Sequence, residues 1–307
     1  LPASQVRTVT GSVFDSLGMR DLTGTVVRMP ALGRETTTDF LGRFRFDSVA
    51  VGIWDVETTF APLEAVGQSR LASVADLRTY VGDVVPVLEV RAAKAARVNY
   101  IAVNELGERT WQIGHQQTVG YRDSMTRLNT IALGGDYARV RTDARVVGQG
   151  ATTRQVALYY ADGTQMHDFR TLQDHVAPRT NSDLLFKGAV QDQAKSVYTG
   201  LIRIREEAKG SAAYQTNRNL TLSEGAWAES VPNLDIRNND VKCSHASTVG
   251  PIDDEQRFYL ESRGIPPQDA EQLVVLGFFD DVLSVLPVGS LRPELRARVA
   301  AKLQRRA

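Results

Sequence analysis

Cys243 and His245 are the residues of this chain whose types and spacing point most directly to metal chemistry. In an extended strand, side chains two residues apart point to the same face, so this thiol and imidazole would stand side by side. Zinc and iron–sulfur sites normally take about four protein ligands. If the pair belongs to a metal site, the remaining ligands must come from elsewhere, such as a second chain. Taken from the residues alone, burial of Cys243 as a small apolar residue is the default interpretation.

Other catalytic motifs are missing from the sequence. There is no Gly-x-x-x-x-Gly-Lys-Ser/Thr phosphate loop, no His-Glu-x-x-His, no Cys-x-x-Cys and no Gly-x-Ser-x-Gly elbow. His167-Asp168 and Asp174-His175 each place an imidazole beside a carboxylate, but neighbours on a strand point to opposite faces. We therefore interpret both pairs as structural and expect a protein that is not an enzyme.

Composition narrows the class of partner. Lys and Arg number 36 and Asp and Glu also number 36, so the net charge of zero argues against a broad nucleic-acid or membrane footprint. The longest apolar run, around Leu273–Phe279, is too short to span a bilayer. One cysteine excludes an internal disulfide and is typical of a reducing compartment, so we expect a cytoplasmic location.

The chain reads as three segments. Residues 1–75 contain short alternating strands separated by turn residues, which indicates a small β-sandwich. Residues 76–252 are β-rich, and evenly spaced glycines with few hairpin signals favour a solenoid of short rungs, although a sandwich stays open. Polar rows such as residues 215–219 are unusual for a half-buried strand and suit a ladder between stacked rungs.

Residues 253–307 form a helical tail. Asp253, Asp254 and Glu255 place negative charge in a first turn, and this helix should end at Gly264. Pro266-Pro267 opens a second helix with an apolar stripe that ends before Pro287. We predict that the stripe contains Ala270, Leu273, Val274, Gly277, Phe278, Val282 and Val285. Ser290 is a plausible N-cap for a final helix, whose basic residues we interpret as a solvated face.

Two resemblances to known families add to this interpretation. Residues 36–46 and 49–54 are similar to the repeat of carboxypeptidase-regulatory-like, transthyretin-like modules, in which Phe46 and Trp54 would be core residues. Residues from about 95 to 290 resemble the SufD scaffold subunits of the SUF iron–sulfur cluster assembly system. The runs that carry this resemblance are Leu172–His175, Ser182–Val190, Tyr214–Leu220, Ser230–Ile236 and Asp240–Ile265.

The SufD resemblance implies a right-handed parallel β-helix followed by C-terminal helices, acting in a complex with a SufB-like paralogue and a SufC-like ABC ATPase. It implies that His245 and Cys243 are ligands of an iron–sulfur cluster or iron site shared with SufB. The cluster or iron would be bound only transiently. ATP hydrolysis would belong to the SufC-like ATPase, so no nucleotide is expected on this chain. The C-terminal helices would dock that ATPase. The expected contact residues are Asp253, Phe258, Tyr259, Arg263, Phe278 and Phe279.

A second function from a different class stays open. A small sandwich of this kind is mostly extracytoplasmic, so the chain is alternatively an extracytoplasmic β-rich binding module with no cluster role.

Overall fold

A computed structural model describes residues 6–12, 14–15, 20–21, 24, 26–29, 32–40, 43–50, 57–59, 71–72 and 86–304. The chain divides into two compact units, Leu1–Val81 and Gly82–Ala307. Trp54, an expected core residue of the first unit, lies outside the described residues.

The first unit is built from antiparallel strands. β1 pairs with β6, β2 pairs with β3, and a further sheet has the order β5-β4-β7-β8. Val27, Met29, Phe44 and Phe46 are buried, as expected for the inward positions of alternating strands. The likeness to transthyretin-like modules stays a prediction. The strands are β1 Val6–Ser12, β2 Phe14–Asp15, β3 Arg20–Asp21, β4 Val26–Met29, β5 Arg34–Thr37, β6 Arg43–Ala50, β7 Glu57–Thr59 and β8 Leu71–Ala72.

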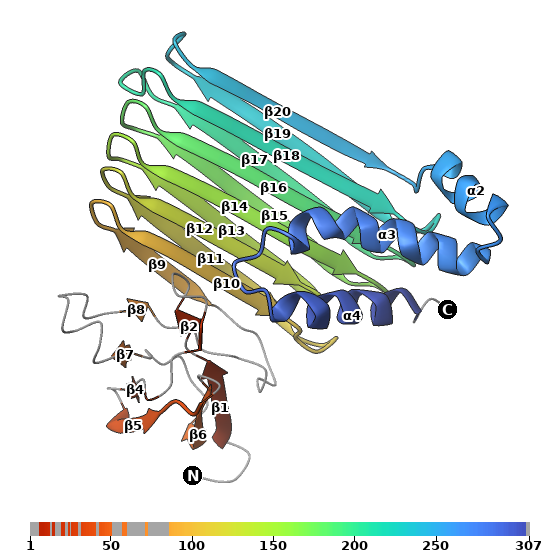
Figure 1. Cartoon of the computed structure of the whole chain (residues 1–307), viewed down its shortest axis with the longest axis horizontal. Helices are drawn as coiled ribbons and strands as arrows, with labels where there is room; N and C mark the ends of the chain where they lie inside the picture. Colours follow the sequence, from red (N-terminus) through yellow and green to blue (C-terminus); the bar gives the residue numbers. More distant parts are fainter. Residues whose placement is uncertain are drawn as a thin grey trace. The chain divides into compact units, whose positions relative to one another are not determined.

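The second unit is a parallel β-solenoid of two six-stranded sheets, which confirms the predicted fold class (Figure 1). The strand orders are β10-β12-β14-β16-β18-β20 and β9-β11-β13-β15-β17-β19, and each ladder keeps one register throughout. The strands are β9 Val87–Ala92, β10 Arg97–Asn104, β11 Trp111–Gly120, β12 Met125–Ala132, β13 Tyr137–Val146, β14 Thr152–Ala161, β15 Met166–His175, β16 Asn181–Val190, β17 Lys195–Ile204, β18 Ala212–Thr221, β19 Trp227–Ile236 and β20 Lys242–Gly250.

The turns at one end of the rungs each contain a residue in the left-handed backbone conformation. Asp123, Gly150, Arg179 and Gly210 have φ values of 56°, 74°, 55° and 71°. Three of their N–H groups donate to the corresponding turn of the next rung, Asp123 to the Gln149 carbonyl, Arg179 to Lys209 and Gly210 to Asp240. Left-handed positions close each turn tightly, so successive rungs stay in register.

The lumen between the sheets holds an aromatic stack and a polar ladder. Tyr159, Phe169, Phe186 and Tyr198 are fully buried, with neighbouring ring centroids 4.6–5.9 Å apart. In the next rung, Asn217 Nδ2 donates to the Tyr159 hydroxyl at 2.9 Å. That hydroxyl donates to Asn219 Oδ1 at 2.5 Å, and Asn219 Nδ2 donates to Asn217 Oδ1 at 2.8 Å. The predicted laddering of the polar row is thereby confirmed for Asn217 and Asn219, whereas the amide of Gln215 is unpaired.

Three helices follow the solenoid, as predicted: α2 Asp254–Ser262, α3 Pro267–Leu283 and α4 Leu291–Gln304. Asp253 caps α2 by accepting hydrogen bonds from the N–H groups of Glu255 and Gln256. α3 and α4 share one apolar core with the outer face of β12, β14 and β16, where Leu158, Tyr160 and Ile131 meet Phe279 and Val299. Within the described residues, no helix is long and apolar enough to cross a membrane.

The predicted apolar stripe of α3 was partly wrong. The helix buries Ala270, Val275, Leu276, Phe279, Val282 and Leu283, whereas Leu273 is 46% exposed. Apolar residues surround most of this helix, so the sequence period did not determine which arc faces the solenoid.

The interpretation of the last helix as a solvated basic face was also wrong for Lys302. This side chain is buried, and its Nζ donates to the carbonyls of Leu133 and Tyr160 and to Gln165 Oε1 at 2.8–2.9 Å. It also lies 2.7 Å from Asp162 Oδ1. Lys187 acts similarly for α3, because its buried Nζ donates to the Phe278 carbonyl at 2.9 Å and pairs with Asp281. Two buried lysines therefore fasten the helices to the solenoid.

Substituting Lys302→Met should lower the free energy of unfolding by about 2–4 kcal/mol, because it leaves buried acceptors and Asp162 without their cation. The matched control is Arg296→Met, which removes an exposed ion pair with Asp280 and should cost less than about 1 kcal/mol. Urea unfolding of both variants measures the difference. Equal losses would show that the buried lysine is not an anchor.

His175 predicts a pH dependence of stability. Burial lowers its pKa to about 4 and outweighs the opposing charge of Asp174. Its ring nitrogens lie 2.8 Å from Thr180 Oγ1 and 2.7 Å from Ser182 Oγ. In the unfolded chain histidine takes up a proton near pH 6.5, so the unfolded state binds more protons between about pH 6.5 and pH 4. Stability contributed by neutral His175 is therefore present above this window and lost as the pH falls through it.

The substitution His175→Gln should flatten this decline by up to about 1.4 kcal/mol per pH unit. Urea unfolding at several pH values between 7 and 4.5 measures the slope. Thr180→Val is the control, because it removes one hydrogen-bond partner and keeps the imidazole, so it should lower stability and preserve the slope. Parallel curves for the parent chain and His175→Gln would contradict the assignment.

Candidate functional site

Cys243 and His245 lie on β20, the last strand of the solenoid. Their register partners on β18 are Ala213 and Gln215, both of which are buried. Cys243 packs against the lumen cluster of Ile202, Ile204, Ala208 and Ala213. In a parallel ladder, register partners point to the same side, so His245 also faces the lumen. The structure therefore brings the predicted pair onto one face.

The two side chains differ in environment. His245 is exposed, whereas Cys243 is partly buried, and burial raises the pKa of its thiol. At neutral pH the thiol keeps its proton, and a bound metal ion would displace it because the thiolate is the ligand. In the isolated chain Cys243 is therefore a partly buried, protonated thiol and not a reactive nucleophile.

The last rung is an uncovered layer of the core. Among the described residues, β20 pairs only with β18 and β19 only with β17, and neither of the two last strands has a buried residue. The register places Leu234, Ile236 and Val249 on the lumen side, yet they are 41–44% exposed. By contrast, Leu88, Val90 and Ala92 on β9, in the first rung, are buried. An exposed layer of core residues marks an interaction surface.

Cys243 and His245 place one thiol and one imidazole at this open end, two side chains of the kinds that can bind metals. Within the part of the chain that the structure describes, no group of three or more His, Cys, Asp or Glu side chains is arranged to hold a metal ion.

A second exposed region lies on α2. Phe258 is 71% exposed and Tyr259 is 58% exposed, and the guanidinium of Arg263 lies 5.1 Å from the centre of the Tyr259 ring. A shallow groove runs between α2 and α3, and Tyr259 and Leu260 line it together with Leu273 and Val274. α2 buries no residue, so both of its large aromatic side chains are available at the surface.

The expected contact residues on α3 need a correction. Phe279 is fully buried against Tyr160 and the solenoid, so it is part of the core and has no surface to offer a partner. Phe278 is partly buried, and the Nζ of Lys187 lies 4.5 Å from its ring centre. Consecutive residues of a helix lie about 100° apart, and here that separation divides the pair between core and surface.

The two histidines of β15, His167 and His175, are buried in the lumen of the solenoid. His167 is buried, its Nε2 lies 3.3 Å from the Gly134 carbonyl, and burial lowers its pKa to about 3. Asp168 turns to the other face and pairs with Arg139 and Arg170. The interpretation of the His-Asp neighbours as structural is therefore confirmed, since each imidazole points inward and each carboxylate pairs outward.

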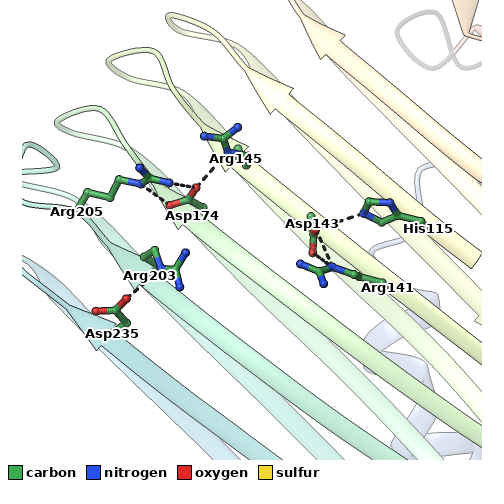
Figure 2. A network of polar contacts seen from close by, with 8 residues as sticks. All are labelled: His115, Arg141, Asp143, Arg145, Asp174, Arg203, Arg205 and Asp235. Carbon is green, nitrogen blue, oxygen red and sulfur yellow. Dashed lines mark hydrogen bonds and ion pairs between the residues drawn. The ribbon is translucent and has the colours of Figure 1, made fainter.

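Sequence reasoning missed an Arg/Asp network on the outer face of the second sheet (Figure 2). Asp174 accepts hydrogen bonds from Arg145 and Arg205, one rung to either side of it. Burial raises the pKa of Asp174, but the two guanidinium groups outweigh burial and hold that pKa below its usual value. Arg203 pairs with Asp235 in the same way. The alternation of Arg139, Arg141, Asp143 and Arg145 in the sequence is the signal that places such charges on one face.

Comparison with known proteins assigns the family. The model for "SUF system FeS cluster assembly, SufBD core domain" matches residues 71–278. An iron–sulfur cluster assembly SufBD family protein of Mycobacterium tuberculosis is 38% identical over 219 residues, which cover 68% of this chain and 55% of that protein. The iron–sulfur cluster assembly protein SufD of Escherichia coli is 31% identical over 240 residues, covering 78% and 56% respectively. SufD of Bacillus subtilis is 31% identical over 245 residues, covering 76% and 55%.

The chain thus spans little more than half the length of these relatives. Because the family model covers most of the chain and the solenoid with it, this chain belongs to the SufBD family of iron–sulfur cluster assembly proteins.

Proposed function

We propose that this chain is a non-enzymatic, cytoplasmic scaffold subunit that pairs with a SufB-like paralogue and docks a SufC-like ABC ATPase. The observation that carries the proposal is the open last rung, where Cys243 and His245 face the lumen on a strand with one neighbour. The family match argues against the alternative of an extracytoplasmic binding module with no cluster role.

Pairing at the last rung follows from its unsatisfied groups. A strand with one neighbour leaves about half of its backbone N–H and C=O groups unpaired, and such an edge accepts another strand. The lumen-side residues Leu234, Ile236 and Val249 add apolar area that a partner would cover. A paralogous β-solenoid presents the same kind of edge, so two last rungs would complete each other's sheets.

The partner would complete the metal site. Cys243 supplies a thiolate once its proton is displaced, and His245 supplies an imidazole, both of which suit iron and iron–sulfur clusters. The nascent cluster is the cargo of the assembly reaction, held transiently between the two chains. This chain contributes two ligands and the apolar lumen wall behind them, which limits access of water.

The surface around α2 suits the ATPase. Phe258 and Tyr259 offer exposed aromatic side chains, Arg263 stacks on Tyr259, and Asp253 sets the start of the helix. α3 continues from this surface onto β14 and β16, to which Lys187 ties it. Motion driven by ATP hydrolysis would pass through these helices and open the interface between the last rung and the SufB-like chain. Opening this interface would expose Cys243 and His245.

The substitution His245→Ala should lower the yield of assembled cluster at least severalfold and leave complex formation intact, because it removes a ligand from an exposed position. The measurement is cluster content by absorbance and iron analysis after reconstitution of the complex with the SufB- and SufC-type proteins of the same source. His115→Ala, on the outer face of β11, is the matched control and should keep the parent yield. An unchanged yield in His245→Ala would contradict the ligand role.

The pair of substitutions Phe258→Asp and Tyr259→Ala should abolish co-purification of the ATPase and preserve pairing with the SufB-like chain. Both side chains are exposed, so folding should be unaffected. Tyr121→Ala removes an aromatic side chain that is 42% exposed at the turn after β11 and serves as the control. Deleting residues 253–307 is unsuitable as a test, because α3 and α4 share the solenoid core. Retention of the ATPase by the double variant would rule out this surface.

A further inference from the structure

Gln215 is a buried glutamine whose side chain has no hydrogen-bond partner. It is 2% exposed, and among the described residues neither its Nε2 nor its Oε1 makes a hydrogen bond. A buried amide left unpaired costs stability, so a glutamine at this position requires an explanation. Other lumen glutamines have a partner for at least one amide atom; Gln155 Nε2 donates to the Thr142 carbonyl and Gln173 Nε2 donates to Ser182 Oγ.

The carboxamide of Gln215 crosses the lumen to the opposite sheet. A Cβ added to Gly200 on β17 would lie 2.3 Å from Gln215 Nε2 and 2.5 Å from the Tyr198 hydroxyl. The absence of a side chain at Gly200 therefore makes the space that the amide fills. The Tyr198 hydroxyl is already paired with Thr171 Oγ1 at 2.9 Å. With Nε2 against Gly200, Oε1 is the atom left to accept a hydrogen bond.

The next layer of the lumen places His245 in register with Gln215. In that layer Gln215 is followed by His245, and Gly200 on the facing strand is followed by Pro232. Register partners in a parallel ladder stack roughly 4.8 Å apart, so imidazole and carboxamide are neighbours along the solenoid axis. Pro232 has no N–H to donate. Ser230 in the same layer is in register with Tyr198 and not with Gln215, so the imidazole of His245 is the donor that stacks directly on Gln215.

We propose that Gln215 is the positioning residue for His245: a rotation of the two side chains lets Oε1, which is unpaired in the structure, accept a hydrogen bond from one ring N–H and leaves the other ring nitrogen free to bind metal. This rests on the proposed ligand role of His245. A neutral imidazole carries one donor and one acceptor, and a hydrogen bond to the donor selects both the tautomer and the ring orientation. Metal-binding histidines generally receive such support from an acceptor behind the ring.

The test reads the tautomer of His245 directly in the isolated chain. The protein is labelled with 15N-histidine, and long-range 1H–15N correlation spectra are recorded at pH 8. The chain has four histidines, so His245→Ala assigns the signal of interest and His167 and His175 report on the fold. In the parent chain His245 should populate one tautomer. In Gln215→Met, which keeps the length of the side chain, the tautomer ratio should fall roughly fivefold, toward that of the urea-unfolded chain.

Two further variants separate positioning from general damage. Gln215→Glu keeps an acceptor and should keep the bias, whereas Gln155→Leu alters a lumen glutamine two rungs away and should leave His245 unchanged. If Gln215→Met does not fold, Gln215→Asn, with a side chain too short to reach, should release the tautomer instead. A mixed tautomer in the parent chain, or a ratio unchanged by loss of Gln215, overturns the proposal.

The outcome is distinguishable from failure of the proposed function. If His245 is positioned by Gln215 but binds no metal, the tautomer bias remains and His245→Ala leaves cluster yield unchanged. If His245 is a ligand without this support, the yield falls in His245→Ala and the spectra of Gln215→Met match those of the parent chain.

Discussion

Parallel pairing between successive rungs is the constraint on which the rest of this structure depends. Each strand obtains its backbone hydrogen bonds from the strands one turn before and one turn after it, and the register is unbroken along both sheets. A strand within the stack is therefore satisfied on both edges, while the strand that ends the stack is satisfied on one. Among the described residues β19 and β20 occupy that position at the last rung, so the exposed edge that carries Cys243 and His245 is a direct consequence of where the stack ends.

Stacking also determines how polar residues are used. Lumen side chains repeat along the axis, so each polar group must find its partner in the same column or across the lumen. Tyr159, Asn217 and Asn219 do so within one network. On the outer face, Asp174 lies between arginines of the rungs on either side. These contacts link rungs that are far apart in the sequence. Forming them costs little conformational entropy, because the strands already hold the interacting side chains in place.

The C-terminal helices α2, α3 and α4 connect the end of the solenoid to its outer face. α3 and α4 bury the outer face of β12, β14 and β16, where Lys187 and Lys302 donate hydrogen bonds to carbonyls that would otherwise be unpaired in an apolar layer. α2, which carries the exposed aromatic residues, begins shortly after β20 ends (Figure 1). A partner bound at α2 is thus adjacent to the strand that carries Cys243 and His245, and α3 connects that contact to the body of the solenoid.

Local patterns in the sequence predicted the elements well, because caps, proline positions and strand alternation are properties of neighbouring residues. Asp253, Gly264 and Pro267 mark helix ends, and the i, i+2 spacing placed Cys243 and His245 on one face. Which arc of α3 is buried, why Phe279 belongs to the core and why Lys302 is buried depend on residues more than a hundred positions away. The same holds for Gln215, since its unpaired amide and its position beneath His245 arise only when rungs stack. The spacing of residues in the sequence does not predict these contacts, because they form between segments that only the tertiary fold brings together.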